Sequence, residues 1–165
     1  MRYKRFKRIA QKAEFIDEFI DHYRRIRRRI SFPHKAAETV IKLLFPRSKH
    51  LGRGAYKSVY YVYSQERDLV LKLSPTKNLK RDFKVYEKVP ETIRNRYIAK
   101  MYWHTRYCLL QKLGKRPRKL SEKDPRLIDL KYRLKPYGLT DIRPDNVCLF
   151  KGNLKVVDAN LSRRK

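Results

Sequence analysis

Three side chains in the last third of the chain have the types and spacing needed for chemistry at a metal ion. Asp141 and Asn146 are separated by four residues, and Asp158 follows twelve positions after Asn146. Carboxylate and amide oxygens are hard ligands of the kind that Mg²⁺ accepts, together with water and substrate phosphates. Asn146 and Asp158 are therefore candidate magnesium ligands, and Asp141 is placed to accept a proton from a hydroxyl nucleophile.

A β-hairpin is expected to bring these residues together. Residues 147–150 have the pattern of a strand, residues 151–153 (Lys-Gly-Asn) the pattern of a turn, and residues 154–157 the pattern of the returning strand. The two ends of a hairpin lie side by side. We therefore expect Asn146 and Asp158 to flank one small space.

At these positions the chain resembles the protein-kinase-like superfamily. Residues 141–146, DIRPDN, are similar to the kinase catalytic loop. The resemblance implies that Asp141 orients the acceptor hydroxyl, that Arg143 offsets charge on the transferred phosphoryl group, and that Asn146 is a metal ligand.

The chain also departs from the kinase pattern around this loop. Residues 158–160, DAN, stand where the family has its metal-binding Asp-Phe-Gly, and only Asp158 matches. Leu139-Thr140 replaces the usual His-Arg, which implies a kinase without the phosphorylation switch of the activation loop. The simpler alternative is that Asp, Asn and Asp occur around a β-hairpin by chance.

The composition predicts a folded basic protein. The 165 residues are 41% hydrophobic and include 12 Tyr and 7 Phe, enough to bury a core in one domain. Lys and Arg number 44 against 16 Asp and Glu, so the formal net charge is +28. Such a surface attracts polyanions: RNA, DNA and acidic protein patches are the expected partners, and a membrane surface is less favoured.

Membrane and export signals are not expected. No apolar run is long enough to span a bilayer, and residues 1–15 lack the apolar core of a secretory signal. Cys108 and Cys148 are isolated in apolar, strand-like runs, which indicates buried thiols in a reducing compartment. The expected location is cytoplasmic.

Two helices are predicted before the rest of the domain. Apolar residues recur at steps of three and four over residues 9–30, and again over residues 35–45, with a break at 31–33. The side opposite the first apolar stripe carries Arg24, Arg25, Arg27, Arg28 and Arg29. These arginines are either a phosphate-binding face or an ordinary solvated helix face, and charge patterning favours neither.

A glycine-containing hairpin follows. Residues 50–74 read as three strands, and Gly52-Arg53-Gly54 with Val59 is similar to the kinase Gly-rich loop. The resemblance implies that the glycines let the backbone approach phosphates and that Val59 packs on the base. Lys57 stands at the third glycine position and could itself contact phosphate. A Gly-x-Gly taken alone is more often only a turn.

Lys72 is the predicted phosphate-binding cation. It lies among aliphatic residues about twenty positions after Gly52, which resembles the third-strand lysine that holds the α- and β-phosphates. The alternative is an outward-facing residue of an edge strand. The family pairs this lysine with an acid on the next helix, here expected over residues 79–89, and both Asp82 and Glu87 fit.

The remaining cofactor prediction concerns the adenine edge. Residues 98–104 and 107–113 read as another strand pair. The resemblance implies that the backbone of residues 110–113, including Gln111 and Leu113, contacts the base. One further helix is expected over residues 124–134.

Together these features predict an α+β, compact protein-kinase-like fold. It comprises a basic helical extension (1–47) that forms a helical hairpin, a nucleotide-binding N-lobe with an antiparallel sheet (48–113), and a much reduced C-lobe (114–165). The resemblance covers about residues 51–158, and with seven residues after Asp158 it implies a kinase-like domain without an activation segment or peptide-binding helices.

The implied activity is an ATP- and Mg²⁺-dependent phosphotransferase, a serine/threonine-kinase-like enzyme. It would transfer the γ-phosphate to a hydroxyl of a protein, an RNA or a small molecule, by analogy with stripped-down members such as RIO-type kinases. The alternative is a catalytically weak or inactive kinase-like scaffold that binds nucleic acid or another anionic partner.

Overall fold

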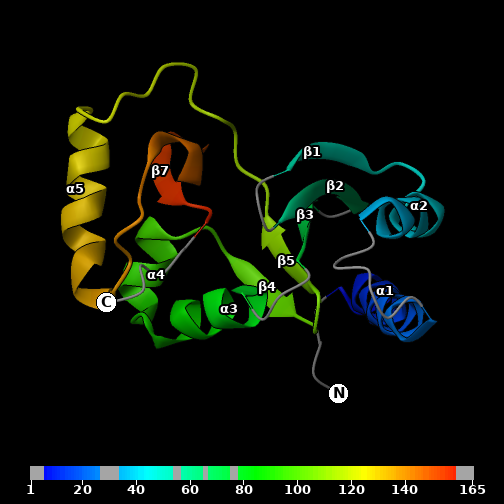
Figure 1. The fold of residues 1–165 in the computed structure, drawn as a ribbon. Coiled ribbons are helices and arrows are strands. Elements are labelled where there is room, and N and C mark those ends of the chain that lie inside the picture. Colours follow the sequence, from blue (N-terminus) through cyan, green and yellow to red (C-terminus); the bar gives the residue numbers. More distant parts are fainter. Residues whose placement is uncertain (1–5, 27–33, 54–56, 65–66, 75–77, 159–165) are drawn as a thin grey trace. The chain divides into compact units, whose positions relative to one another are not determined.

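The computed structural model describes residues 6–26, 34–53, 57–64, 67–74 and 78–158, and it confirms the α+β class. Residue contacts divide the chain into two compact units (Figure 1). Unit 1 comprises Met1–Lys80 and Tyr102–Lys112, and unit 2 comprises Arg81–Met101 and Leu113–Lys165. The boundaries predicted from the sequence were 47/48 and 113/114; in this division the N-terminal helices belong to the same unit as the sheet.

Unit 1 is built on a five-stranded sheet whose strands follow the order β1-β2-β3-β5-β4. The pairings of β1 with β2, β2 with β3 and β3 with β5 are antiparallel. The strands are β1 (Lys49–Arg53), β2 (Ser58–Ser64), β3 (Arg67–Leu73), β4 (Met101–His104) and β5 (Cys108–Lys112). The three strands expected between residues 50 and 74 are therefore confirmed.

The prediction for the segment before β4 was wrong at its start. Strand was expected from residue 98, but β4 begins at Met101, and Ile98 forms only a single bridge with Val156. The segment before it is a helix that the sequence reading missed, α4 (Glu91–Tyr97). Pro90 had been interpreted only as a helix terminator, whereas it also occupies the N-cap of α4, next to the position where proline is well tolerated.

Two helices cover one face of the sheet in unit 1, α1 (Lys7–Ile26) and α2 (His34–Leu44) (Figure 1). Both agree with the predicted amphipathic segments where the structure describes them; Arg27 to Arg29 lie outside the described residues. Small residues allow α1 to approach the strands closely, since Ala10 and Ala13 are buried in the core cluster. The shared core includes Ile16, Ile20, Ala37, Ile41, Tyr60, Val62, Leu69, Leu71, Leu73, Cys108 and Leu110.

Two acids of α1 attach it to the turn between β4 and β5. The Asp17 carboxylate accepts hydrogen bonds from the backbone N–H groups of Arg106 (2.7 Å) and Tyr107 (3.0 Å). The Asp21 carboxylate accepts from the Tyr107 hydroxyl at 2.7 Å and forms an ion pair with Arg106. Burial raises the pKa of Asp17 above its usual value. These bonds make α1 an integral part of unit 1.

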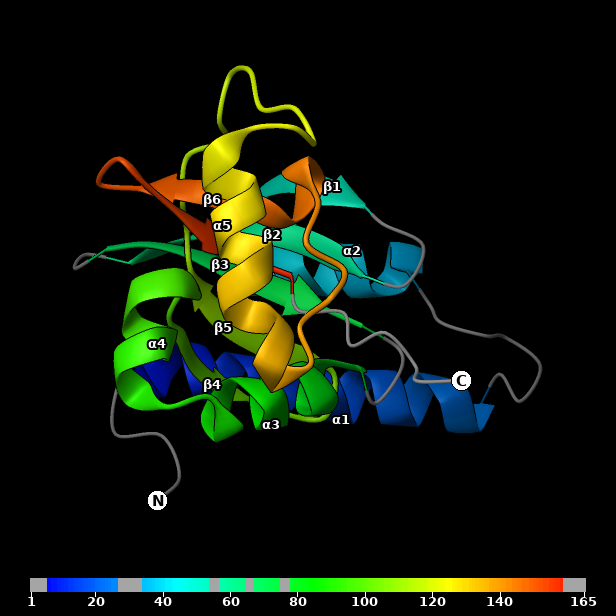
Figure 2. The ribbon, with the colours of Figure 1, turned by 90° about the vertical axis from the view of Figure 1, so that its left-hand side faces the viewer.

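Unit 2 contains most of α3 (Asn78–Lys88), then α4, α5 (Pro125–Leu134) and a hairpin of β6 (Val147–Phe150) and β7 (Asn153–Val156). α5 starts as the sequence predicts: the Asp124 side chain accepts from the N–H of Arg126 at 2.9 Å, and Pro125 follows at the first helical position. Figure 2 shows α5 beside the hairpin, and both α4 and α5 contact β7.

The hairpin turn explains the glycine in the predicted Lys-Gly-Asn signal. Phe150 pairs with Asn153, so the loop consists of Lys151 and Gly152, with φ values of +51° and +83°. Positive φ at both central residues is what a two-residue type I′ turn requires.

Replacing Gly152 by Ala should lower the free energy of unfolding by about 1 to 2 kcal/mol, because a side chain at positive φ is strained. No atom lies within 4 Å of a Cβ built at Gly152, so the loss would come from the backbone conformation alone. Chemical denaturation measures it. Gly52→Ala is the matched control, because the space around Gly52 is equally open and its φ is not positive. Equal effects of both substitutions would contradict the turn assignment.

A second glycine is required by close packing. A Cβ on Gly114 would lie 2.6 Å from the Phe150 ring and 2.7 Å from Cβ of Cys148. The next residue, Lys115, exchanges backbone hydrogen bonds with Leu149 at 3.0 and 2.8 Å. Gly114 therefore lets the chain after β5 lie directly against the hairpin.

The two cysteines differ in burial. Cys108 is buried, which raises the pKa of its thiol, whereas Cys148 is half-buried; neither forms a disulfide.

Of the helices that the structure describes, none has the length and apolar character needed to cross a membrane.

Candidate functional site

The loop before β6 holds the first two predicted site residues of unit 2 together. The Asn146 side-chain nitrogen donates to the backbone oxygen of Asp141 at 2.8 Å, and the Asn146 N–H donates to the oxygen of Arg143 at 2.9 Å. Asn146 is only 8% exposed. Because its nitrogen is used by this bond, the amide oxygen is the atom of Asn146 that can coordinate a cation.

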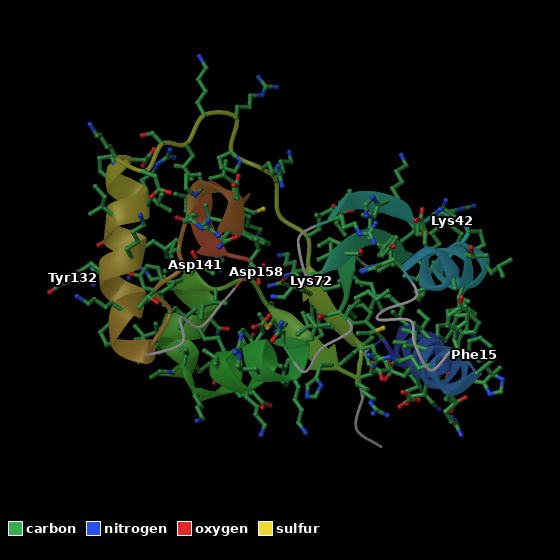
Figure 3. The ribbon with its side chains drawn as sticks, viewed as in Figure 1. Phe15, Lys42, Lys72, Tyr132, Asp141 and Asp158 are labelled. Atoms are coloured by element: carbon green, nitrogen blue, oxygen red, sulfur yellow. The ribbon has the colours of Figure 1, made fainter. Side chains whose placement is uncertain are left out.

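The other end of the hairpin meets the same loop. The backbone oxygen of Asn146 accepts from the N–H groups of Val157 (2.8 Å) and Asp158 (3.4 Å). Figure 3 labels Asp141 and Asp158 beside the hairpin. The expectation that the hairpin brings Asn146 and Asp158 together is therefore correct for the backbone. Ala159 and Asn160 lie outside the described residues.

An ion pair orients the predicted catalytic carboxylate. Arg143 Nε lies 2.9 Å from Asp141 Oδ1, and Arg143 Nη2 lies 3.4 Å from Asp141 Oδ2. The side chains are 60% and 30% exposed, respectively. A two-point contact fixes the plane of the carboxylate, but a pair this exposed adds at most about 1 kcal/mol. Arg143 can therefore turn to another anion at small cost.

The oxygen donors of unit 2 suit a Mg²⁺ ion that also binds waters and phosphates, rather than a metal ion held by protein side chains alone. No three His, Cys, Asp or Glu side chains of the described ranges cluster closely enough to hold a metal ion. Asn146 and Asp158 supply two hard oxygen donors instead. Mg²⁺ binds through one or two such protein ligands and completes its shell with waters and substrate phosphates. The donor set is thus compatible with Mg²⁺ that arrives together with a phosphate ligand.

In unit 1, Lys72 lies on the face of the sheet opposite to α1 and α2. Its neighbours along β3, Leu71 and Leu73, belong to the core that those helices cover, and side chains alternate along a strand. Lys72 is paired with Val59 on β2 and with Leu109 on β5. Paired residues of antiparallel strands point to the same side. The N-terminal helices therefore leave the Lys72 face uncovered.

Lys72 is also in an unusual environment for a lysine. It is 5% exposed, and Lys57, which precedes β2, is 7% exposed. Lysines are almost never this buried unless a negative group partners them. The central position of β3 in the sheet excludes the alternative in which Lys72 is the outward residue of an edge strand.

The glycine loop is described only in part. Gly52 lies inside β1, opposite Val59, next to an irregularity in the register between His50 and Gly52. Gly54 lies outside the described residues. The pairing of Gly52 with Val59 agrees with the predicted glycine hairpin. On its other side, Val59 is paired with Lys72 of β3.

The residues predicted to contact the adenine edge lie at the end of β5. Gln111 is a buried residue inside β5, opposite Val70, and Leu113 is the first residue after Lys112, at which β5 ends. Val70 and Leu109 lie on the same face of the sheet as Lys72, and both are buried. Strand alternation with Lys72 was the signal that could have identified Val70.

The structure distinguishes Asp82 from Glu87, the two acids of α3 that the sequence offers as the partner of a phosphate-binding lysine. Asp82 is 2% exposed, whereas Glu87 is exposed. A carboxylate is rarely buried without a partner, so Asp82 occupies a position built for a specific interaction. Glu87 has the exposure of an ordinary solvated helix charge.

Comparisons with other proteins do not assign the chain. No protein-family model matches the sequence, and no curated protein matches it either. The function is therefore inferred from the residues of this chain and their contacts.

Proposed function

We propose that the protein is an ATP- and Mg²⁺-dependent phosphotransferase of protein-kinase-like fold, which transfers the γ-phosphate to a hydroxyl group. The observation that supports this most is the hydrogen-bonded loop of unit 2, in which Asn146 binds both the backbone of Asp141 and that of Asp158. These bonds link the backbones of the proposed proton acceptor, Asp141, and of the two proposed metal ligands, Asn146 and Asp158. If the three residues occurred around the hairpin by chance, such bonds would not be required.

In unit 2, each residue of the loop has a separate role. Asp141 orients the acceptor hydroxyl and accepts its proton, and Asn146 and Asp158 hold the metal through their oxygens. Bound Mg²⁺ supplies charge neutralisation at the β- and γ-phosphates. Arg143 leaves its exposed pair with Asp141 to offset charge on the phosphoryl group during transfer.

In unit 1, the Lys72 face binds the nucleotide. Lys72 contacts the α- and β-phosphates, and Val59, which is half-buried and paired with Lys72 across β2 and β3, packs on the base. On α3, Asp82 is the better candidate than Glu87 for the acid that the resemblance predicts, because Asp82 is buried and Glu87 is exposed.

The test of these roles is the stabilisation of the protein by ATP and Mg²⁺. A ligand at about 100 times its Kd adds roughly 2.7 kcal/mol of stability, which shifts the thermal midpoint by several degrees. Wild type and Glu87→Gln should show this shift, whereas Lys72→Met and Asp82→Asn should lose most of it. Each variant is compared with its own nucleotide-free midpoint, so that a general loss of stability does not count. A full shift in Lys72→Met would contradict the proposed phosphate contact.

A second candidate, a kinase-like scaffold without turnover, is favoured by two observations. The net charge is +28, and Lys57 replaces the third glycine of the loop over the nucleotide. If the protein is such a scaffold, ATP either stabilises it without being converted to ADP, or has neither effect. Measuring ADP formation separates it from the phosphotransferase.

A further inference from the structure

We infer that a pocket between the end of α1 and the turn that joins β4 to β5 binds a phosphate monoester through its phosphate group. The pocket lies in unit 1 and contains none of the residues assigned to phosphotransfer. The inference is therefore independent of the proposed function and holds for an enzyme or a scaffold.

The pocket has a volume of about 480 Å³ and is lined by residues from two separate parts of the chain. Asp21, Arg24 and Arg25 belong to the C-terminal part of α1, and Arg106 and Tyr107 belong to the turn between the two strands. A volume of this size is within the range of small-ligand pockets, about 300 to 1,000 Å³. It accommodates an organic group as well as a phosphate.

The lining carries an excess of positive charge. Three arginines stand against one acid, Asp21. The Asp21 carboxylate is already paired, because Arg106 Nη1 lies 2.6 Å from one oxygen and the Tyr107 hydroxyl donates to the other at 2.7 Å. Arg106 thus balances Asp21, and the two charges of Arg24 and Arg25 remain for an anionic ligand.

A second acid, Asp17, lies one helical turn earlier on α1 and does not line the pocket. Its carboxylate oxygens accept the backbone N–H groups of Arg106 and Tyr107. Even with Asp17 counted, the arginines outnumber the two acids that hold the turn.

The two arginines of α1 keep most of their hydrogen-bonding capacity. Arg24 Nη1 donates to the Tyr107 hydroxyl at 3.1 Å, and Arg25 Nε donates to the backbone oxygen of Asp21 at 3.4 Å. Each guanidinium therefore uses one of its five N–H donors within the described part of the chain. The other donors can bind a ligand.

The Tyr107 ring positions two of the three cations. The guanidinium carbons of Arg24 and Arg106 lie 5.8 Å and 5.3 Å from the centre of this ring, which is itself buried. Positioned cations lose less conformational entropy on binding than mobile ones. A planar guanidinium can also bind two oxygens of a phosphate group at once.

Helix stability alone does not explain this arrangement. Basic residues in the last turn of a helix complement its dipole, which would account for Arg24 and Arg25. It would not account for Arg106, which lines the same pocket from a different part of the chain. A phosphate-binding role was one of the two interpretations that the sequence left open for the α1 arginines, and the pocket favours it for Arg24 and Arg25.

Convergent arginines favour a phosphate monoester over other anions. A monoester carries a charge of about −1.5 to −2 at pH 7 and three acceptor oxygens, so it can accept hydrogen bonds from α1 and from the turn together. A phosphodiester has a single negative charge, and a carboxylate offers two oxygens in one plane. Either of these would leave one of the two surplus positive charges unbalanced.

The arginines are tested by calorimetric titration with phenyl phosphate at constant ionic strength. Arg24→Gln combined with Arg25→Gln should raise the Kd at least about tenfold, the usual effect of losing a hydrogen bond to a charged group. The matched control, Lys7→Gln with Arg8→Gln, removes the same charge from exposed positions at the other end of α1 and should retain the affinity. Equal losses in both double variants would reduce the binding to general charge attraction and overturn the inference.

Two single variants separate the pocket from a folding defect and from the proposed nucleotide site. Arg25 is exposed, so Arg25→Gln should weaken binding severalfold without changing the thermal midpoint of the ligand-free protein. Lys72→Met should keep the affinity for phenyl phosphate, because Lys72 does not line the pocket. Unchanged binding in Arg25→Gln, loss of binding in Lys72→Met, or no binding by wild type at millimolar concentration would each overturn the inference.

Three comparison ligands test the chemistry of recognition in the same assay. Dimethyl phosphate has one negative charge, and malonate carries two charges on planar carboxylates; each should bind at least about tenfold more weakly than phenyl phosphate. Inorganic phosphate should also bind more weakly, because it lacks the organic group. If any of the three bound as tightly as phenyl phosphate, the assignment of a phosphate monoester would be wrong.

Discussion

Replacing Asp141 by Asn is expected to lower ADP formation from ATP by about two to four orders of magnitude, the usual contribution of a positioned proton acceptor. An amide cannot accept the proton of the attacking hydroxyl. The substitution should leave the loop intact, because Asn146 binds the backbone oxygen of Asp141 and not its side chain. ATP affinity should therefore stay within about twofold of wild type. Labelled ATP measures the rate, with phosphate counted on protein, on RNA and in water.

The neighbouring acid supplies the control for this experiment. Asp145 is exposed in the same loop and has no role in the proposed mechanism. Asp145→Asn removes the same charge four residues away and should retain nearly full activity. If Asp141→Asn formed ADP as fast as wild type, the assignment of Asp141 would be wrong.

Replacing Ile16 by Ala is expected to lower the free energy of unfolding by about 2 to 5 kcal/mol. Ile16 is fully buried in the core shared by α1 and the sheet, so its removal deletes apolar contacts and leaves a cavity. A loss of this size is a large part of the stability of a typical domain. Chemical denaturation followed by circular dichroism measures it.

The adjacent residue provides the matched control. Phe15 is 53% exposed on the same helix, and Phe15→Ala should change the stability by no more than about 0.5 kcal/mol. If both substitutions had the small effect, the packing of α1 on the sheet would be contradicted.

Local patterns were sufficient to predict most of the elements and the loop of the site. The Lys151-Gly152 signal between two apolar runs predicts the hairpin, and the hairpin in turn places Asn146 and Asp158 together. The helices α1, α2 and α5 overlap the three segments in which the sequence predicts helices. α4 was missed because seven residues are too short for a helical period to stand out, and because Pro90 indicates a break equally well.

Non-local features could not be predicted in the same way. Alternation along β3 separates Lys72 from Leu71, but only the packing of α1 and α2 shows which face they cover. Burial separates Asp82 from Glu87, although both fit the helix pattern. One groove of unit 2 is lined by three stretches, residues 95–97, 125–133 and 152–155, whose proximity depends on the fold of unit 2.

The central claim is a metal-dependent nucleotide site, and calorimetric titration with ATP, with and without Mg²⁺, tests it most directly. Wild type should bind ATP more tightly with Mg²⁺, because the metal joins the phosphates to Asn146 and Asp158. Asp158→Ala should lose the gain from Mg²⁺ while keeping the weaker metal-free binding through Lys72. If neither ATP nor GTP bound wild type at millimolar concentration, or if Asp158→Ala kept the full gain, the proposed mechanism would be contradicted.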